Sequence, residues 1–225
     1  MFTVYLVDDD QGVLNALSRL LRAKGYDTRC FSSAEQFLER HDPAVAGCAI
    51  FDVAMPGLDG LALQQVFKTG GNQRPVIFLT GKGNIPRSVQ AMRAGAIDFL
   101  TKPVNDIALL DAIARAEQED AKARQTRAEF AAIEAKIATL TPREREVLAH
   151  VVAGRLNKQI AGDLGTVEKT IKVHRGRMME KLGVRTVADL VRLAEKAGYL
   201  DPGHFLGSPC LLALGPTRQS PGRSR

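Results

Sequence analysis

The first half of the chain repeats one pattern: a short apolar run, then a polar residue, then a segment whose apolar residues have helical spacing. Apolar runs of four to six residues bounded by turn residues are typical of buried strands. Strands that alternate with helices indicate a parallel sheet covered on both faces. We therefore expect a five-stranded, doubly wound parallel sheet in residues 1–120. The expected strands are Val4–Val7, Asp27–Phe31, Ala46–Phe51, Val76–Thr80 and Asp98–Leu100, and the expected helices are Gly12–Lys24, Ser33–Arg40, Leu61–Lys68 and Ile85–Ala94.

Polar residues follow four of these strands at the point where each strand ends. They are Asp8 and Asp9, Asp52, Thr80, and Lys102. The carboxyl ends of parallel strands meet in one crevice, where ligands collect. Singly, each residue has a plainer interpretation: the aspartates could cap a helix, and Thr80 and Lys102 could be turn residues. Their joint placement instead favours a shared site for Mg²⁺ and a phosphoryl group.

Within that site the carboxylates divide into metal ligands and a nucleophile. Asp9 and Asp52 could ligate Mg²⁺ directly, with Asp8 holding a metal-bound water. Asp52 is the candidate nucleophile, because a carboxylate can accept a phosphoryl group as an acyl phosphate.

Residues 1–120 resemble the receiver domain of two-component response regulators. The resemblance implies that Asp52 is the phosphoacceptor, that Asp8, Asp9 and the backbone carbonyl of Ala54 bind Mg²⁺, and that a histidine kinase is the partner. It also implies that Thr80 and Lys102 contact the phosphoryl group, that Phe99 is an aromatic switch, and that the Lys102–Pro103 bond is cis. Ala54 departs from the polar residue common there, which leaves the lifetime of the phosphoryl state open. The matching segments are Leu6-Val7-Asp8-Asp9-Asp10, Phe51-Asp52, Met55-Pro56, Asp59-Gly60, Leu79-Thr80-Gly81, Ala94-Gly95-Ala96 and Lys102-Pro103.

The segment that follows lacks both proline and glycine from about Asn105 to Thr139. Its apolar residues lie on a helical stripe, while the middle, 117–127, is almost wholly polar. We expect one long helix joining two domains, with 121–139 as the linker. A frayed polar linker is the alternative for the middle, since alanine specifies no partner. The stripe comprises Leu110, Ile113, Phe130, Ile133, Ile137 and Leu140.

Residues 140–199 read as four short helices separated by glycine-containing turns. Thr141 to Glu144 form a capping box with proline at the first helical position, which is a strong helix start. Asn157 is expected to cap the second helix. For the third helix, Glu168–Leu182, Val167 offers no cap, so that either Thr166 caps it or the helix loses about 1 kcal/mol. The fourth helix is expected at about Thr186–Ala197. Such a pattern indicates a helix-turn-helix bundle.

This region resembles the LuxR-type helix-turn-helix of transcription regulators. The matching segments are Leu140 to Leu148, Asn157 to Ala161, Glu168 to Arg175 and Lys181 to Val184. On the third helix, Ile171, Met178 and Leu182 form an inward stripe, and Lys169, Lys172, Val173, Gly176 and Arg177 share the opposite face. A recognition helix inserts such a face into the major groove, and whether His174 faces the core or the groove is left open. The residues expected to contact DNA are Asn157, Lys158, Lys169, Thr170, Lys172, Val173, His174 and Arg177.

Charge and composition agree with these assignments. Residues 126–225 hold 17 Lys and Arg against 10 Asp and Glu, a net charge of +7, whereas residues 1–125 carry −1. A basic domain suits a polyanionic partner, although a merely basic surface is an equal alternative on charge alone. The three cysteines are odd in number and widely spaced, which fits a reducing cytoplasm. No apolar run reaches the roughly 20 residues of a membrane span. Residues 200–225 are expected to be disordered.

Together these features predict a cytoplasmic DNA-binding response regulator. Phosphorylation of Asp52 is expected to promote homodimerisation and binding to promoter DNA. One rival is a regulator that binds DNA independently of phosphorylation and uses the receiver only to dimerise. A second rival is an aspartyl-phosphate phosphatase, which would need an acid two residues beyond the nucleophile, where Ala54 stands.

Overall fold

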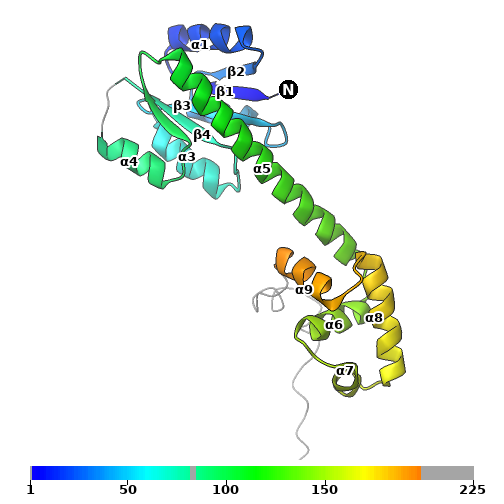
Figure 1. The fold of residues 1–225 in the computed structure, drawn as a ribbon. Coiled ribbons are helices and arrows are strands. Elements are labelled where there is room, and N and C mark those ends of the chain that lie inside the picture. The colour runs from blue at the N-terminus through cyan, green and yellow to red at the C-terminus, as the bar shows by residue number, and fades with distance from the viewer. Residues whose placement is uncertain (1, 82–84, 199–225) are drawn as a thin grey trace, which may run out of the picture. The chain divides into compact units, whose positions relative to one another are not determined.

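The computed structural model describes residues 2–81 and 85–198, and the chain divides into two compact units that meet between Thr126 and Arg127 (Figure 1). In the first unit five parallel strands form one sheet in the order β2-β1-β3-β4-β5. This is the expected doubly wound topology. The strands are β1 (Thr3–Val7), β2 (Asp27–Phe31), β3 (Gly47–Asp52), β4 (Val76–Thr80) and β5 (Asp98–Thr101).

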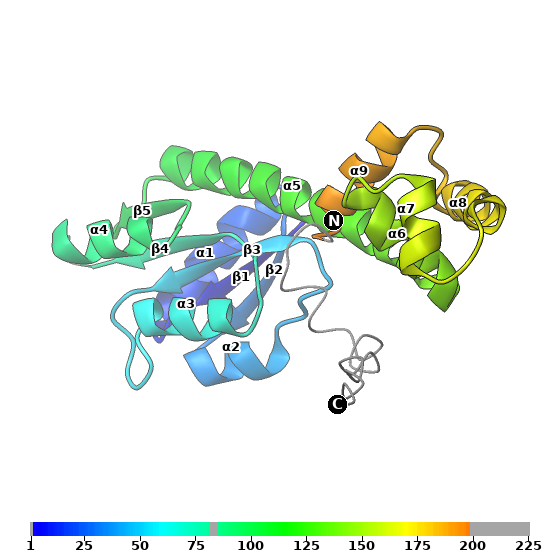
Figure 2. The ribbon, with the colours of Figure 1, turned by 90° about the horizontal axis from the view of Figure 1, so that it is seen from below.

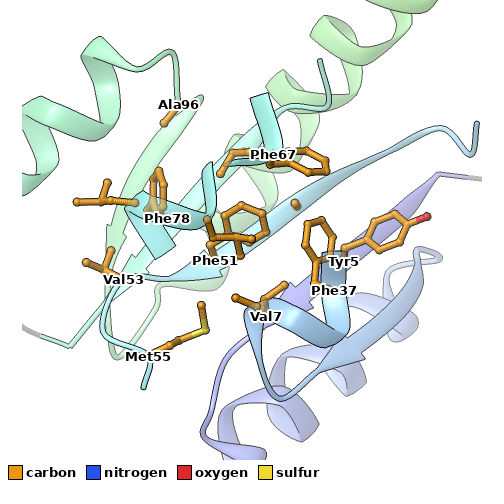
Figure 3. Packing of buried hydrophobic residues seen from close by; sticks show 14 of the residues in the cluster. Tyr5, Val7, Phe37, Phe51, Val53, Met55, Phe67, Phe78 and Ala96 are labelled. Atoms are coloured by element: carbon orange, nitrogen blue, oxygen red, sulfur yellow. The ribbon is translucent and has the colours of Figure 1, made fainter. Parts of the chain in front are cut away.

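Helices cover both faces of this sheet (Figure 2). Because side chains alternate along a strand, β1 sends Val4 and Leu6 to one face and Tyr5 and Val7 to the other. The first face packs against α1 (Gln11–Ala23) and α5 (Asp106–Ala138). The second packs against α2 (Ala34–Arg40), α3 (Gly60–Thr69) and α4 (Ile85–Arg93), with the rings of Phe37, Phe51 and Phe67 at its centre (Figure 3).

Helix α5 runs without a break over 33 residues and crosses the boundary between the two units. The long helix predicted from the sequence is therefore confirmed. Of the predicted stripe, Ile113, Ile137 and Leu140 are buried. Phe130 is 37% exposed and belongs to none of the three hydrophobic clusters of the described residues.

The second unit holds the end of α5 and four further helices around one apolar core. These are α6 (Pro142–Val152), α7 (Asn157–Asp163), α8 (Glu168–Leu182) and α9 (Val187–Lys196). The core comprises residues from every one of them, including Ile160, Ile171 and Leu190. The bundle is the arrangement that the sequence predicts. The predicted disorder of residues 200–225 lies outside the described residues.

The start of α7 differs from expectation, and at the start of α8 one of the two alternatives is observed. The prediction that Asn157 caps α7 is wrong: Leu156 is the N-cap residue, and its backbone N–H donates to the side chain of Gln159 at 2.9 Å. Asn157 is instead the first helical residue. Val167 is the N-cap residue of α8, and among the described residues no side chain caps that helix, so Thr166 does not take the role.

None of the helices in the described parts of the chain combines the length and the apolar character needed to cross a membrane.

A buried ion pair fastens α6 to α8. Glu144 accepts hydrogen bonds from the backbone N–H of Thr141 at 2.8 Å and from Lys181 Nζ at 2.6 Å, and its side chain is 3% exposed. Thr141 Oγ1 in turn accepts from the Glu144 N–H, which completes the predicted capping box. The hydrogen bond from Lys181, opposed by burial and aided by Thr141, lowers the pKa of Glu144 to about 2.

We predict that Glu144→Gln lowers the free energy of unfolding of the second unit at pH 7 by about 1–2 kcal/mol, because the cap loses its charge. A depressed pKa stabilises the fold fully above the ordinary value of 4.5 and loses that effect as the pH falls through about 2. The difference between the variant and the wild type should therefore shrink from pH 7 to pH 2.5. Urea unfolding followed by the NMR methyl signals of Ile160 and Leu190 measures it.

The matched control is Glu146→Gln, because Glu146 pairs with Arg143 on the exposed side of the same helix. That change should cost only a few tenths of a kcal/mol. Equal effects of the two substitutions would contradict the role given to Glu144.

Candidate functional site

Three charged residues from three strand ends lie in contact at the carboxyl edge of the sheet. Lys102 Nζ is 2.6 Å from Asp8 Oδ2 and 2.8 Å from Asp52 Oδ1. Asp8 follows β1, Asp52 ends β3, and Lys102 follows β5. Both carboxylates are buried, so the ammonium compensates charge that water solvates poorly. The sequence expectation that these strand ends converge is confirmed in their geometry.

The three consecutive aspartates after β1 have different surroundings. Asp10 is the N-cap residue of α1 and accepts from the backbone N–H of Gly12 at 2.7 Å. Asp8 accepts from the backbone N–H of Asp10 and faces Lys102. Asp9 is exposed, yet one of its carboxylate oxygens lies within 4.8 Å of oxygens of Asp8 and Asp52. Three carboxylates so grouped are the hard oxygen donors that Mg²⁺ prefers.

The pKa values of the cluster follow from burial and pairing. Burial raises the pKa of Asp8 above its ordinary value, although the hydrogen bond from Lys102 opposes the shift. Burial disfavours the Lys102 ammonium, but the hydrogen bonds to Asp52 and Asp8 outweigh that effect and raise the pKa of Lys102. The lysine is therefore a firmly held cation at neutral pH.

The remaining predicted residues of this site lie just after β3 or on the strands β4 and β5. Thr80 is the last residue of β4 and is buried, and its carbonyl accepts from the Lys102 N–H at 2.7 Å. Ala54 is exposed, and its N–H donates to Asp52 Oδ2 at 2.8 Å. Phe99 on β5 is half-buried, with its ring 6.2 Å from that of Phe78. The Lys102–Pro103 bond is cis, as expected.

One residue that shapes the site was not singled out by sequence reasoning. Gly60 is the first residue of α3, and a Cβ added to it would lie 2.1 Å from the backbone oxygen of Asp52. Only a glycine lets α3 begin this close to the end of β3. The signal in the sequence was the Asp59-Gly60 pair, in which Asp59 caps α3 through the Ala62 N–H at 2.8 Å.

In the second unit, α8 presents a basic face. Lys169, Lys172, Val173 and Arg177 are exposed, while Ile171, Met178 and Leu182 are buried. The predicted division of the helix into two faces is therefore observed. Thr170 and His174 are half-buried and lie at the border between the faces.

The two residues of α7 that were predicted to contact DNA differ in their exposure. Lys158 is exposed, as a phosphate contact requires. Asn157 is half-buried, and its Oδ1 accepts from Arg175 Nη1 on α8 at 2.9 Å. Arg175 was not among the predicted residues, and it ties the two helices of the helix-turn-helix together.

Comparison with known proteins identifies both units. Residues 4–114 match the family model of the response regulator receiver domain, and residues 138–194 match that of the bacterial regulatory proteins of the luxR family. The chain belongs to the two-component response regulators that carry a LuxR-type DNA-binding domain.

Curated relatives match along nearly their whole length. The chain is 40% identical to nodulation protein W of Bradyrhizobium diazoefficiens, over 87% of this chain and 86% of the relative. It is 44% identical to the response regulator protein TmoT of Ectopseudomonas mendocina, over 86% and 88%. The solved structure of the response regulator StyR is 45% identical with a TM-score of 0.75, and the match covers 86% of this chain and 98% of that one.

We predict that Gly60→Ala destabilises the receiver unit by about 1–3 kcal/mol, because the methyl group would overlap the Asp52 carbonyl and push the start of α3 away from β3. Urea unfolding followed by the methyl signals of Ile50 and Ile77 measures the loss. Gly70→Ala, at the other end of α3, is the control. A Cβ there meets no atom closer than 3.5 Å, so that change should be nearly neutral. A neutral Gly60→Ala would contradict the close approach.

Proposed function

We propose that this response regulator is phosphorylated on Asp52 by a histidine kinase, and that the phosphorylated chain dimerises and binds promoter DNA. The observation that carries the proposal is the position of Lys102 Nζ, which lies 2.8 Å from the Asp52 carboxylate and 2.6 Å from the Asp8 carboxylate. A cation held at a buried carboxylate is placed to neutralise charge on a group transferred to it.

The chemical step is a displacement at phosphorus. An Asp52 carboxylate oxygen forms a bond to phosphorus, and the bond from phosphorus to the imidazole nitrogen of the kinase histidine breaks, leaving its electron pair on that nitrogen. Lys102 balances the charge on one phosphoryl oxygen, and the Thr80 hydroxyl interacts with another. These residues position and neutralise groups, and covalent assistance beyond Asp52 is not needed.

The donor set fits a magnesium ion. Asp8, Asp9, Asp52 and the backbone carbonyl of Ala54 would hold Mg²⁺, which supplies a compensating positive charge at the transferring group. Since Ala54 would use its backbone, the missing polar side chain leaves metal binding intact. Ala54 is exposed and lies two residues after Asp52. A water molecule that attacks the phosphoryl group would therefore meet no polar side chain at position 54.

Transmission of the signal would start at Thr80 and Phe99. A phosphoryl group on Asp52 draws the Thr80 hydroxyl toward it, and the half-buried Phe99 ring on the neighbouring strand moves into the space released. The surface that changes comprises α4, β5 and α5. Helix α4 exposes Val89 and Met92, 44% and 47% accessible, which suits pairing with a second copy. Two copies would bring two α8 helices onto the half-sites of a palindromic promoter.

We predict that a small phosphodonor with Mg²⁺ adds one phosphoryl group to the wild-type chain and none to Asp52→Asn, as measured by intact mass. DNA binding should tighten at least fivefold for the wild type on the same treatment, with a shift to dimer by light scattering. Glu39→Gln, which changes an exposed carboxylate on α2, is the control and should behave as the wild type. Equal DNA binding by every variant with and without the donor would overturn the switch and favour a receiver that only supports dimerisation.

The contribution of the basic face is tested separately. Lys169→Ala should weaken binding to all DNA sequences and reduce the slope of log K against log salt by about 1, because one phosphate contact is lost. Fluorescence anisotropy over a series of salt concentrations measures both quantities. Lys122→Ala, an exposed lysine on α5, should leave the slope unchanged. A slope that Lys169→Ala leaves unaltered would remove α8 from the DNA interface.

A further inference from the structure

The loop between α2 and β3, residues 42–45, is fixed by side chains that bind its backbone. Arg74 Nη2 donates to the Asp42 carbonyl at 2.6 Å and to the Val45 carbonyl at 2.9 Å. The Asp42 side chain accepts from the Ala44 N–H at 2.8 Å, which closes an Asx turn. The loop belongs to no helix or strand, so these hydrogen bonds set its conformation.

Arg74 is suited to hold the loop because its own side chain is held in place. It lies two residues before β4 and is 6% exposed, and its guanidinium carbon is 4.1 Å from the centroid of the Tyr5 ring. A buried cation requires hydrogen-bond acceptors, and the ring face adds a favourable contact. The loop is thereby tied to the start of β4 and to the middle of β1.

A third carbonyl of the loop is bound from α5. Arg124 Nη1 donates to the Ala44 carbonyl at 2.7 Å. Arg124 is half-buried, and the exposed stretch 125–132 begins directly after it. A hydrogen bond with a charged donor is stronger than one between neutral groups. The loop therefore binds α5 at the point where its buried part ends.

We propose that the carbonyls of residues 42–45 form a binding site for the Arg124 guanidinium, and that this latch fixes where α5 leaves the receiver unit. Arg74 is the positioning residue of the latch, since it binds the carbonyls on both sides of Ala44. In a phosphorylated dimer, a fixed exit of α5 narrows the range of positions open to each DNA-binding unit. Once one unit is bound, the second then has a higher effective concentration at its half-site. This last step rests on the proposed function.

Hydrogen exchange of the full-length chain tests the latch itself. Arg124→Gln removes the guanidinium and keeps a good helix former, and it should accelerate exchange of the α5 amides 121–126 at least fivefold. Lys122→Gln makes the same change of charge at an exposed position of α5 and should exchange like the wild type. Arg124→Lys retains a donor and should recover part of the protection. Equal exchange in Arg124→Gln and Lys122→Gln would overturn the latch.

A second variant tests whether the loop is the partner of Arg124. Asp42→Ala removes the Asx turn that orients Ala44, and it should accelerate exchange of the same α5 amides. Arg124→Gln added to Asp42→Ala should then have little further effect, because the two changes break one interaction. Fully additive effects would contradict the assignment of the loop as the site.

The consequence for DNA binding is measured on two duplexes. One is selected from a random-sequence pool by the phosphorylated full-length chain, and the other is half of it, cut at its centre of symmetry. After treatment with the phosphodonor and Mg²⁺, Arg124→Gln should bind the whole site at least threefold more weakly than the wild type and the half-site equally well. Intact mass should show the same phosphoryl incorporation in both proteins.

Unchanged affinity for the whole site, or an equal loss on both duplexes, would overturn the role of the latch in DNA binding. A wild-type chain whose DNA binding does not respond to the phosphodonor would instead count against the proposed function. The exchange experiment decides the existence of the latch in either case, because it needs neither DNA nor phosphorylation.

Discussion

The contact of Lys102 with Asp8 and Asp52 is the interaction on which the receiver unit depends. The strand order places β1 beside β3, so the two buried carboxylates are neighbours as a direct consequence of topology. Like charges at such a site repel strongly unless a cation accompanies them. The cation comes from the end of β5. Strand β4 lies between β5 and β3, so the axes of β5 and β3 are about 9.5 Å apart. A long, flexible lysine spans that separation, whereas a shorter cation would not reach both carboxylates.

Helix α5 contributes side chains to two hydrophobic cores, one in each unit. Its first half buries Leu109 and Ile113 against the sheet, and Ile137 near its end enters the core of the second unit. Arg124 donates to the Ala44 carbonyl at 2.7 Å, which holds the helix to the receiver as far as that turn. Residues 125–132 are exposed throughout, so helicity there depends on the intrinsic preference of alanine and charged residues. Because no core contacts hold residues 125–132, we expect α5 to bend most easily in this stretch when the receiver unit changes conformation.

Periodicity in the sequence was sufficient to predict every strand and the long helix. The spacing of apolar residues along the chain follows directly from which side chains face the core. Side-chain partners across helices were not predictable in this way. Asparagine is a preferred N-cap residue, yet the side chain of Asn157 accepts a hydrogen bond from Arg175 on another helix. The need for glycine at position 60 likewise depends on the distance between α3 and the Asp52 carbonyl, which no local pattern encodes. The charged residues at the strand ends were predictable from the sequence. Which of the three adjacent aspartates caps α1 was not, and the structure shows that it is Asp10.

The charge at the receiver site also bears on why a divalent cation suits it. Asp8, Asp9 and Asp52 bring three negative charges, and Lys102 returns one positive charge. A phosphoryl group on Asp52 removes the carboxylate charge but introduces about two of its own, so the excess negative charge grows beside the buried Asp8. Lys102 alone would leave that excess uncompensated beside the buried Asp8. A hard divalent ion on the remaining oxygens brings the site near neutrality, which is the electrostatic reason to expect phosphorylation of Asp52 to require Mg²⁺ rather than merely to tolerate it.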